Sequence, residues 1–168
     1  MVPEPQKAPV LPPSVVGLVD IGRLIREIDK LEDSLRTADI RGEHRVAPQL
    51  PKLSQLLEDV VSQNRLDLLQ PSHRRALLEF LKLLRKDAPK LHMSFSADPS
   101  PEFISKILRW IRGNLHPHAL LAIGMQPGIG AGCVLRTTNK YFDMSLSKSF
   151  ASSRELLMKR LKTPESQP

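Results

Sequence analysis

The stretch over residues 91–161 constrains the fold most, because it combines strand and helix patterns in a fixed order. Residues 91–96 alternate apolar and polar side chains, which is the period of a half-buried strand. Residues 97–101 then end the strand and begin a helix, with Ser or Asp as N-cap and proline in the first turn. That helix has one apolar stripe and ends at Gly113-Asn114. The stripe consists of Phe103, Ile104, Ile107, Leu108 and Ile111.

Two further strands and a last helix are predicted after this first strand and helix. The strands cover residues 119–125 and 131–136, and β-prone residues continue to Phe142. The glycine-rich turn between the strands predicts a hairpin with close backbone approach. Asp143-Met144-Ser145 is interpreted as the cap of the last helix, whose apolar positions are Phe150, Leu156, Leu157 and Leu161. The residues that we expect to determine the turns and caps are Pro127, Gly128, Gly130, Gly132, Asp143 and Ser145.

Residues 14–88 are predicted to form a helical N-terminal domain. Apolar residues within 14–36 fall at spacings of three and four over about two heptads, which favours bundle packing over a free coiled coil. They are Ile21, Leu24, Ile25, Ile28, Leu31 and Leu35. Further helices are expected from residue 51 or 52 to 63 and over residues 71–86. The proline-rich residues 1–13 predict a disordered or extended leader, residues 89–162 a small β-α-β-β-α domain, and residues 163–168 a frayed tail. The expected fold class is therefore α+β and mostly helical.

The net charge of +7 favours an acidic partner, such as a nucleic acid, an anionic membrane surface or an acidic protein. The longest uncharged run, residues 115–135, contains histidines, prolines and glycines, so we expect no membrane span there. The first 13 residues lack the pattern of a secretory signal. The single cysteine, Cys133, fits a reducing compartment. These features predict a cytoplasmic protein.

The chemically reactive residues do not form a recognisable catalytic or ligand-binding pattern. His116 and His118, with His92 and Cys133, have irregular spacings for zinc ligands. The glycines at 128–132 are followed by Cys133-Val134, where a phosphate-binding loop needs Lys-Ser or Lys-Thr. They also precede a β-prone segment, where a dinucleotide fingerprint needs a helix. We therefore expect no enzyme activity, no metal and no cofactor.

Basic clusters leave nucleic-acid binding or ribosome association open as an alternative function. Arg and Lys neutralise phosphates, but single-strand binders also need stacking aromatic residues, and only Trp110, Tyr141 and Phe142 are suitable. Solvated helix faces are the simpler interpretation. The clusters are His73-Arg74-Arg75, Arg85-Lys86, Arg109 with Arg112, and Lys159-Arg160 with Lys162.

Several landmarks over residues 50–162 resemble, in order, the delta subunit of F-type ATP synthases, called the oligomycin-sensitivity-conferring protein in mitochondria. Asn64-Arg65, followed by Leu66-Asp67-Leu68-Leu69, resembles the family's Asn-Gly-Arg-Leu helix and its leucine-rich turn. Ser96-Ala97-Asp98-Pro99 resembles the Ser-Ala-x-Pro junction between strand and helix. Pro127-Gly128-Ile129-Gly130-Ala131 is similar to the Pro-x-Leu-Ile-Gly-Gly hairpin, and Tyr141-Phe142-Asp143-Met144-Ser145 to the Ile-Asp-Gly-Ser start of the last helix.

The resemblance implies a non-catalytic subunit of a bacterial ATP synthase, at the inner face of the cell membrane without inserting into it. Such a subunit joins the peripheral stalk to the catalytic head and so supports proton-driven ATP synthesis. The implied partners are the C-terminal helix of the stalk subunit and the N-termini of the alpha-type head subunits. We place the stalk contact on Phe150, Leu156, Leu157 and Leu161 and on the exposed face of the hairpin. The family's N-terminal domain has six helices, whereas this chain has a shorter helical region.

Overall fold

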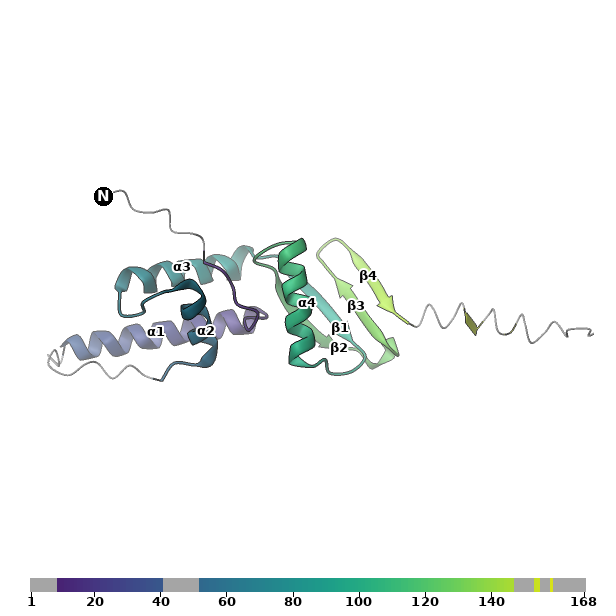
Figure 1. The fold of residues 1–168 in the computed structure, drawn as a ribbon, viewed down its shortest axis with the longest axis horizontal. Coiled ribbons are helices and arrows are strands. Elements are labelled where there is room, and N and C mark those ends of the chain that lie inside the picture. Colours follow the sequence, from purple (N-terminus) through teal and green to yellow (C-terminus); the bar gives the residue numbers. More distant parts are fainter. Residues whose placement is uncertain (1–8, 41–51, 147–152, 155–157, 159–168) are drawn as a thin grey trace, which may run out of the picture. The chain divides into compact units, whose positions relative to one another are not determined.

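The fold is α+β, with four α-helices and a four-stranded mixed sheet among the described residues (Figure 1). The computed structural model describes residues 9–40, 52–146, 153–154 and 158. The chain divides into two compact units, and each is built from two separate stretches. Unit 1 comprises Met1–Pro89 and Glu102–Leu120, and unit 2 comprises Lys90–Pro101 and Leu121–Pro168. The predicted domain boundaries at residues 13, 88 and 162 stay a prediction.

The helices are α1 (Leu18–Ile40), α2 (Gln55–Asn64), α3 (Pro71–Asp87) and α4 (Pro101–Asn114). Each overlaps a helix predicted from the sequence, although α1 begins and ends four residues later than expected. The helix ends have ordinary local causes. Ser54 is the N-cap of α2, where its hydroxyl accepts a hydrogen bond from the Leu57 amide. Arg65 ends α2 in the left-handed conformation, at φ 53°.

The apolar face of α1 is the centre of the helical core in unit 1. Ile21, Leu24 and Ile28 have no exposed surface, and α1 packs against α2 and α3 (Figure 1). The predicted inward positions are therefore confirmed for α1, with Leu35 at the edge of the core. Phe103 of α4 is an exception, because 48% of its surface is exposed although the predicted stripe included it. The other buried members of the core are Leu11, Val15, Ile25, Leu31, Leu57, Val60, Leu68, Leu77, Leu78, Leu81, Leu84, Ala88 and Leu120.

The expectation of a disordered leader is wrong for residues 9–13. Leu11 and Val15 are buried in the helical core. The Val15 amide donates to the Pro12 carbonyl, and the Val16 and Gly17 amides donate to the Asp20 carboxylate just before α1. Residues 9–13 form no helix or strand, as the proline content indicated, but that content did not reveal the two apolar side chains that anchor the segment. Residues 1–8 lie outside the described residues.

The sheet in unit 2 consists of β1 (Lys90–Phe95), β2 (Leu120–Met125), β3 (Gly132–Arg136) and β4 (Tyr141–Ser145), in the order β2-β1-β3-β4. The β1–β3 and β3–β4 pairs are antiparallel. The Leu120 amide donates to Pro89 and the Gln126 amide to Phe95, with the same sequence offset in both bonds. Such a constant offset identifies β2 as parallel to β1, as a connection through a helix requires.

The predicted glycine hairpin between the second and third strands is wrong, because β1 lies between β2 and β3. The chain passes from β2 through a 3₁₀ turn, η1 (Pro127–Ile129), to the other side of β1. The tight hairpin joins β3 to β4 instead. There the Thr137 amide donates to the Lys140 carbonyl at 2.8 Å, and the Lys140 amide donates to the Thr137 hydroxyl at 2.9 Å.

Asp143-Met144-Ser145 forms part of β4 and is not the predicted helix cap. Val134 pairs with Asp143, and Gly132 pairs with Ser145. The Ser145 amide donates to the Asp143 carboxylate at 2.9 Å, a local bond that Asp also makes at turns and helix caps. Because Asp makes the same local bond in both settings, the motif alone did not distinguish a strand from a cap.

Candidate functional site

The predicted stalk-binding residues Phe150, Leu156, Leu157 and Leu161 lie outside the described residues. Ser153, Arg154 and Met158 of the same segment are described, and all three are helical and exposed. The predicted stalk contact on the last helix therefore stays a prediction.

The turn residues lie together in the connection from β2 to β3. Gly130 and Gly132 have positive φ angles of 75° and 96°, which favour glycine. A Cβ atom on Gly132 would lie 2.5 Å from the Met144 carbonyl oxygen, so this position also needs glycine for the close approach of β4. Pro127 begins η1, and Gly128 has open space around it. These residues shape the backbone and offer no reactive group.

The histidines and Cys133 do not come together in the described residues, where no group of three or more His, Cys, Asp or Glu could hold a metal ion. The rings of His116 and His118 are 5.9 Å apart, and His118 also meets the edge of Phe80. Burial, and then the charges of His116 and Arg112, lower the pKa of His118. Cys133 pairs with Phe95, three positions along β1 from His92, so Cys133 and His92 lie on opposite sheet faces. Burial raises the pKa of the Cys133 thiol, which disfavours a nucleophilic role.

One face of the sheet keeps large apolar side chains exposed at both edges. On β4, Phe142 and Met144 are 46% and 50% exposed. Their cross-strand partners are Leu135 and Cys133, so all four side chains share this face. On β2, Met125 is 62% exposed. The predicted contact face belonged to a hairpin of β2 and β3, and those strands are not neighbours in the sheet, so that contact stays a prediction without a direct counterpart here.

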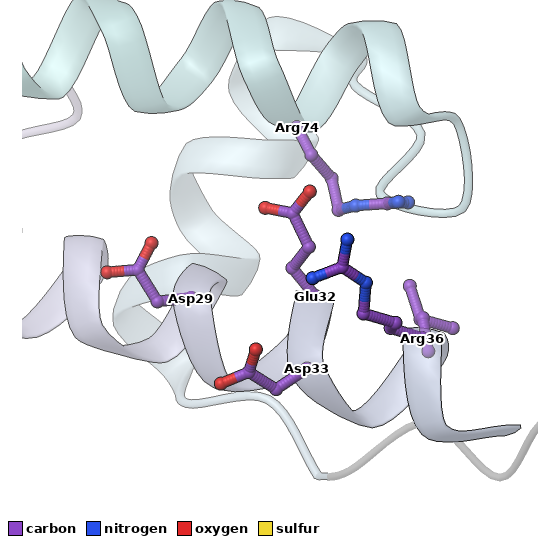
Figure 2. A pocket seen from close by; sticks show the side chains of 6 residues that line it. Asp29, Glu32, Asp33, Arg36 and Arg74 are labelled. Atoms are coloured by element: carbon purple, nitrogen blue, oxygen red, sulfur yellow. The ribbon is translucent and has the colours of Figure 1, made fainter. Parts of the chain in front are cut away.

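A charged pocket of about 470 Å³ lies between α1 and the start of α3 in unit 1. Asp29, Glu32 and Asp33 come from α1 at spacings of three and four, so they lie on one side of that helix. Glu32 and Arg36 extend from α1 toward Arg74 on α3 (Figure 2). The lining provides carboxylates and guanidinium groups but no nucleophile, so it can hold a charged group and does not support catalysis. Leu35 completes the lining.

Arg74 is the buried cation of this pocket, with only 7% of its surface exposed. Its Nη1 donates to the carbonyls of Leu68 and Leu69 at 2.7 and 2.9 Å, whereas its Nε has no partner among the described residues. Sequence reasoning assigned Arg74 to a solvated basic cluster. Its spacing of three and seven from Leu77 and Leu81 was the signal that places it on the buried face of α3.

Within unit 1, a second arginine, Arg112, connects α4 to the segment that precedes α1. It donates to the carbonyls of Leu11, Pro12, Val15 and Ala119 at distances of 2.6–3.2 Å. Burial lowers the pKa of Arg112 to about 10, which still leaves it charged at neutral pH. In the sequence, Arg112 appears only as a member of a basic cluster, and its neighbours give no sign of this structural role.

Neither a protein-family model nor a curated protein matches the chain. Among the described helices, none combines the length and the apolar character that crossing a membrane requires.

Proposed function

We propose that the chain is a non-catalytic connector subunit of a rotary F-type ATP synthase, joining the peripheral stalk to the catalytic head. The observation that carries the proposal is the position of the family-like landmarks. Ser96-Ala97-Asp98-Pro99 lies between β1 and α4, and Pro127-Gly128-Ile129-Gly130-Ala131 lies between β2 and β3. Asn64-Arg65 ends α2, where Arg65 adopts the left-handed conformation that the family's glycine would favour. These three landmarks thus lie at element boundaries in the expected order, whereas Tyr141-Phe142-Asp143-Met144-Ser145 lies within β4.

The finer architecture belongs to the same proposal. A helical bundle over residues 14–88 would precede a β-α-β-β-α domain over residues 89–162, with the last helix following β4. The bundle would meet the N-termini of the alpha-type head subunits, and the second domain would meet the C-terminal helix of the stalk subunit. The protein would work at the inner face of the cell membrane without entering it.

A static connector needs surfaces for partner helices and a rigid core between them. The exposed apolar residues of β2 and β4 supply one such surface, and the packed face of α1 supplies the core. Apolar contact gives the affinity, and charged residues around it fix the register of the bound helix. In this proposal the subunit has a mechanical role, which is to hold the head against the torque of the rotor. Such a role requires no chemical reaction in the subunit and no cofactor.

Affinity purification of the tagged protein from gently solubilised membranes of its own organism tests this proposal. We expect stalk and head subunits in amounts comparable with the tagged protein, identified by mass spectrometry. A variant with Leu156→Ser and Leu157→Ser should lose the stalk subunits. The matched control is Leu83→Ser, which changes an exposed leucine of α3 and should retain them.

Two other outcomes of the same purification would change the assignment. If stalk subunits are recovered without head subunits, the protein binds the peripheral stalk but does not connect it to the catalytic head. Recovery of ribosomal or RNA-associated proteins, with neither stalk nor head, would overturn the proposal in favour of nucleic-acid binding. In that case the affinity for RNA should fall steeply with salt, because bound phosphates release counterions.

A further inference from the structure

Helix α4 carries a row of exposed apolar side chains beside its buried face. Trp110, the single tryptophan of the chain, is 62% exposed, and Phe103 is 48% exposed. With the half-buried Ile107 they are spaced at four and three residues, which aligns them along one side of the helix. We call Phe103, Ile107 and Trp110 the α4 stripe. The buried face of α4 is formed by other residues, Ile104, Leu108 and Ile111.

The α4 stripe has the composition of a binding surface. Tryptophan is the residue type most concentrated at the energetic centres of protein interfaces. Leu115, directly after α4, is 58% exposed and adds to the apolar surface of this part of unit 1. Exposed large apolar groups in a row, bordered by charged residues, mark interaction sites more often than ordinary surface.

The charges beside the stripe indicate the kind of partner. Lys106 and Arg109 are exposed on the flank of α4 next to Trp110, and Glu102 offsets one of the two positive charges. The Arg109 Nε donates to the Ser105 carbonyl at 3.3 Å, which leaves its other donors to reach a partner. The flank is therefore net positive, in a chain of net charge +7. An acidic partner is complementary to it.

The chain's own C-terminal segment is a poor match for this surface. Residues 147–168 contain five basic residues, Lys148, Arg154, Lys159, Arg160 and Lys162, against the two acidic residues Glu155 and Glu165. A basic segment would be repelled by Lys106 and Arg109. An acidic partner helix, in contrast, is complementary in charge to the flank of the stripe.

We propose that the α4 stripe binds one amphipathic helix of a partner protein, whose apolar side chains cover Trp110 and Phe103 and whose acidic residues face Lys106 and Arg109. The α4 stripe and the charges beside it do not depend on the proposed function. If the proposed function holds, the bound helix belongs to the stalk subunit and the stripe is an additional stalk contact.

The single tryptophan makes a direct test possible on the full chain. The probes are two model peptides with the same leucine face, one flanked by glutamates and the other by lysines. We expect the acidic peptide to shift Trp110 emission to shorter wavelength and to protect it from acrylamide, and the basic peptide to do neither. Trp110→Ala should weaken binding of a labelled acidic peptide, followed by anisotropy, by about tenfold or more. The control Leu83→Ala should bind as the natural chain does.

A charge reversal sharpens the test without removing the tryptophan. The double variant Lys106→Glu with Arg109→Glu should prefer the basic peptide over the acidic one. Equal binding of both peptides, unchanged affinity of Trp110→Ala, or a Trp110 already protected from acrylamide in the free chain would each overturn the proposal.

A third probe separates this inference from the proposed function. It is the C-terminal segment of the stalk subunit from the same organism. If the acidic model peptide binds and the stalk segment does not, the α4 stripe is a binding surface for an acidic helix, but that helix does not come from the stalk subunit. If the stalk segment binds equally well to the natural chain and to Trp110→Ala, the connector role holds, but the α4 stripe is not the binding site.

Discussion

Two arginines of unit 1 are held by backbone carbonyls where a carboxylate partner would be more usual. Arg112 makes four such bonds and Arg74 makes two. A planar guanidinium with five donors suits several carbonyl acceptors at once. Arg112 thereby provides hydrogen-bond donors to the carbonyls of a segment, residues 11–15, that forms no helix or strand of its own. Its role is to fix residues 11–15 to α4.

Replacing Arg112 by methionine should therefore destabilise unit 1 and release this segment. The carbonyls of Leu11, Pro12 and Val15 would lose their donor, and we expect a loss of about 2–3 kcal/mol in the free energy of unfolding. Urea titration measures the loss, and hydrogen exchange at the Val15 amide should accelerate. The control Arg109→Met removes an exposed arginine on the same helix and should change stability by less than about 0.5 kcal/mol. Equal effects of the two substitutions would contradict the anchoring role.

Gly132 gives the second prediction at this scale. An alanine there would combine a positive φ with a Cβ 2.5 Å from the Met144 carbonyl oxygen. We expect Gly132→Ala to lower stability by at least about 2 kcal/mol, because β4 must move away from β3. Gly128→Ala is the matched control, since no heavy atom lies within 4 Å and its stability should change little. Thermal melts of both variants measure the difference. Equal melting temperatures would contradict the requirement for glycine at position 132.

At the scale of elements, the sequence predicted the helices well because each has a strong apolar period and a clear terminus. Pro71 begins α3 as expected, and the spacing of Ile21, Leu24 and Ile28 identified the buried face of α1. The order of the strands was not predictable in the same way. Glycines at 128–132 permit both a hairpin and a crossing connection, and the choice depends on which edge of β1 the next strand meets.

The exposed residues of α4 show another limit of periodicity. Phe103 and Ile104 are adjacent and both apolar, so the sequence assigned both to the inward stripe. The structure buries Ile104 and leaves Phe103 48% exposed, so the apolar residues of α4 cover a wider arc than its buried face. The charged pocket was missed for a related reason. Arg74 was grouped with its neighbours in sequence and not with Leu77 and Leu81 on its own face.

The buried face of α1 provides a prediction for this scale. Ile28→Ala removes a fully buried side chain between α1 and its neighbouring helices, and we expect a loss of about 2–4 kcal/mol. Val19→Ala, on the same helix, changes a side chain that is 67% exposed and should cost less than about 1 kcal/mol. Urea unfolding followed by circular dichroism measures both. A small effect of Ile28→Ala would indicate that α1 is loosely packed.

At the scale of the whole molecule, the chain passes between the two units more than once. α4 comes after β1 in sequence, yet it is grouped with α1, α2 and α3 in unit 1. The Arg112 bonds to residues 11–15 and the place of Leu120 in the helical core are the contacts that explain this grouping. Neither contact is visible in the sequence, since each joins residues far apart along the chain.

This discontinuity predicts how fragments behave. A fragment of residues 1–89 ends where the first helical stretch ends, but it lacks α4, Arg112 and Leu120. A fragment of residues 1–120 retains all three. We expect the longer fragment to unfold cooperatively in urea and the shorter one to be less stable by at least about 2 kcal/mol, because buried carbonyls lose their donor and core side chains are exposed.

The design of this experiment separates α4 from simple chain length. The Arg112→Met substitution in the longer fragment should remove much of its advantage, whereas Arg109→Met should not. If the two fragments had the same unfolding midpoint, α4 would contribute nothing to the helical unit, and the boundary near residue 88 predicted from the sequence would describe the folding units better. If the longer fragment is more stable, a helix that follows the first strand in sequence completes the unit that precedes it.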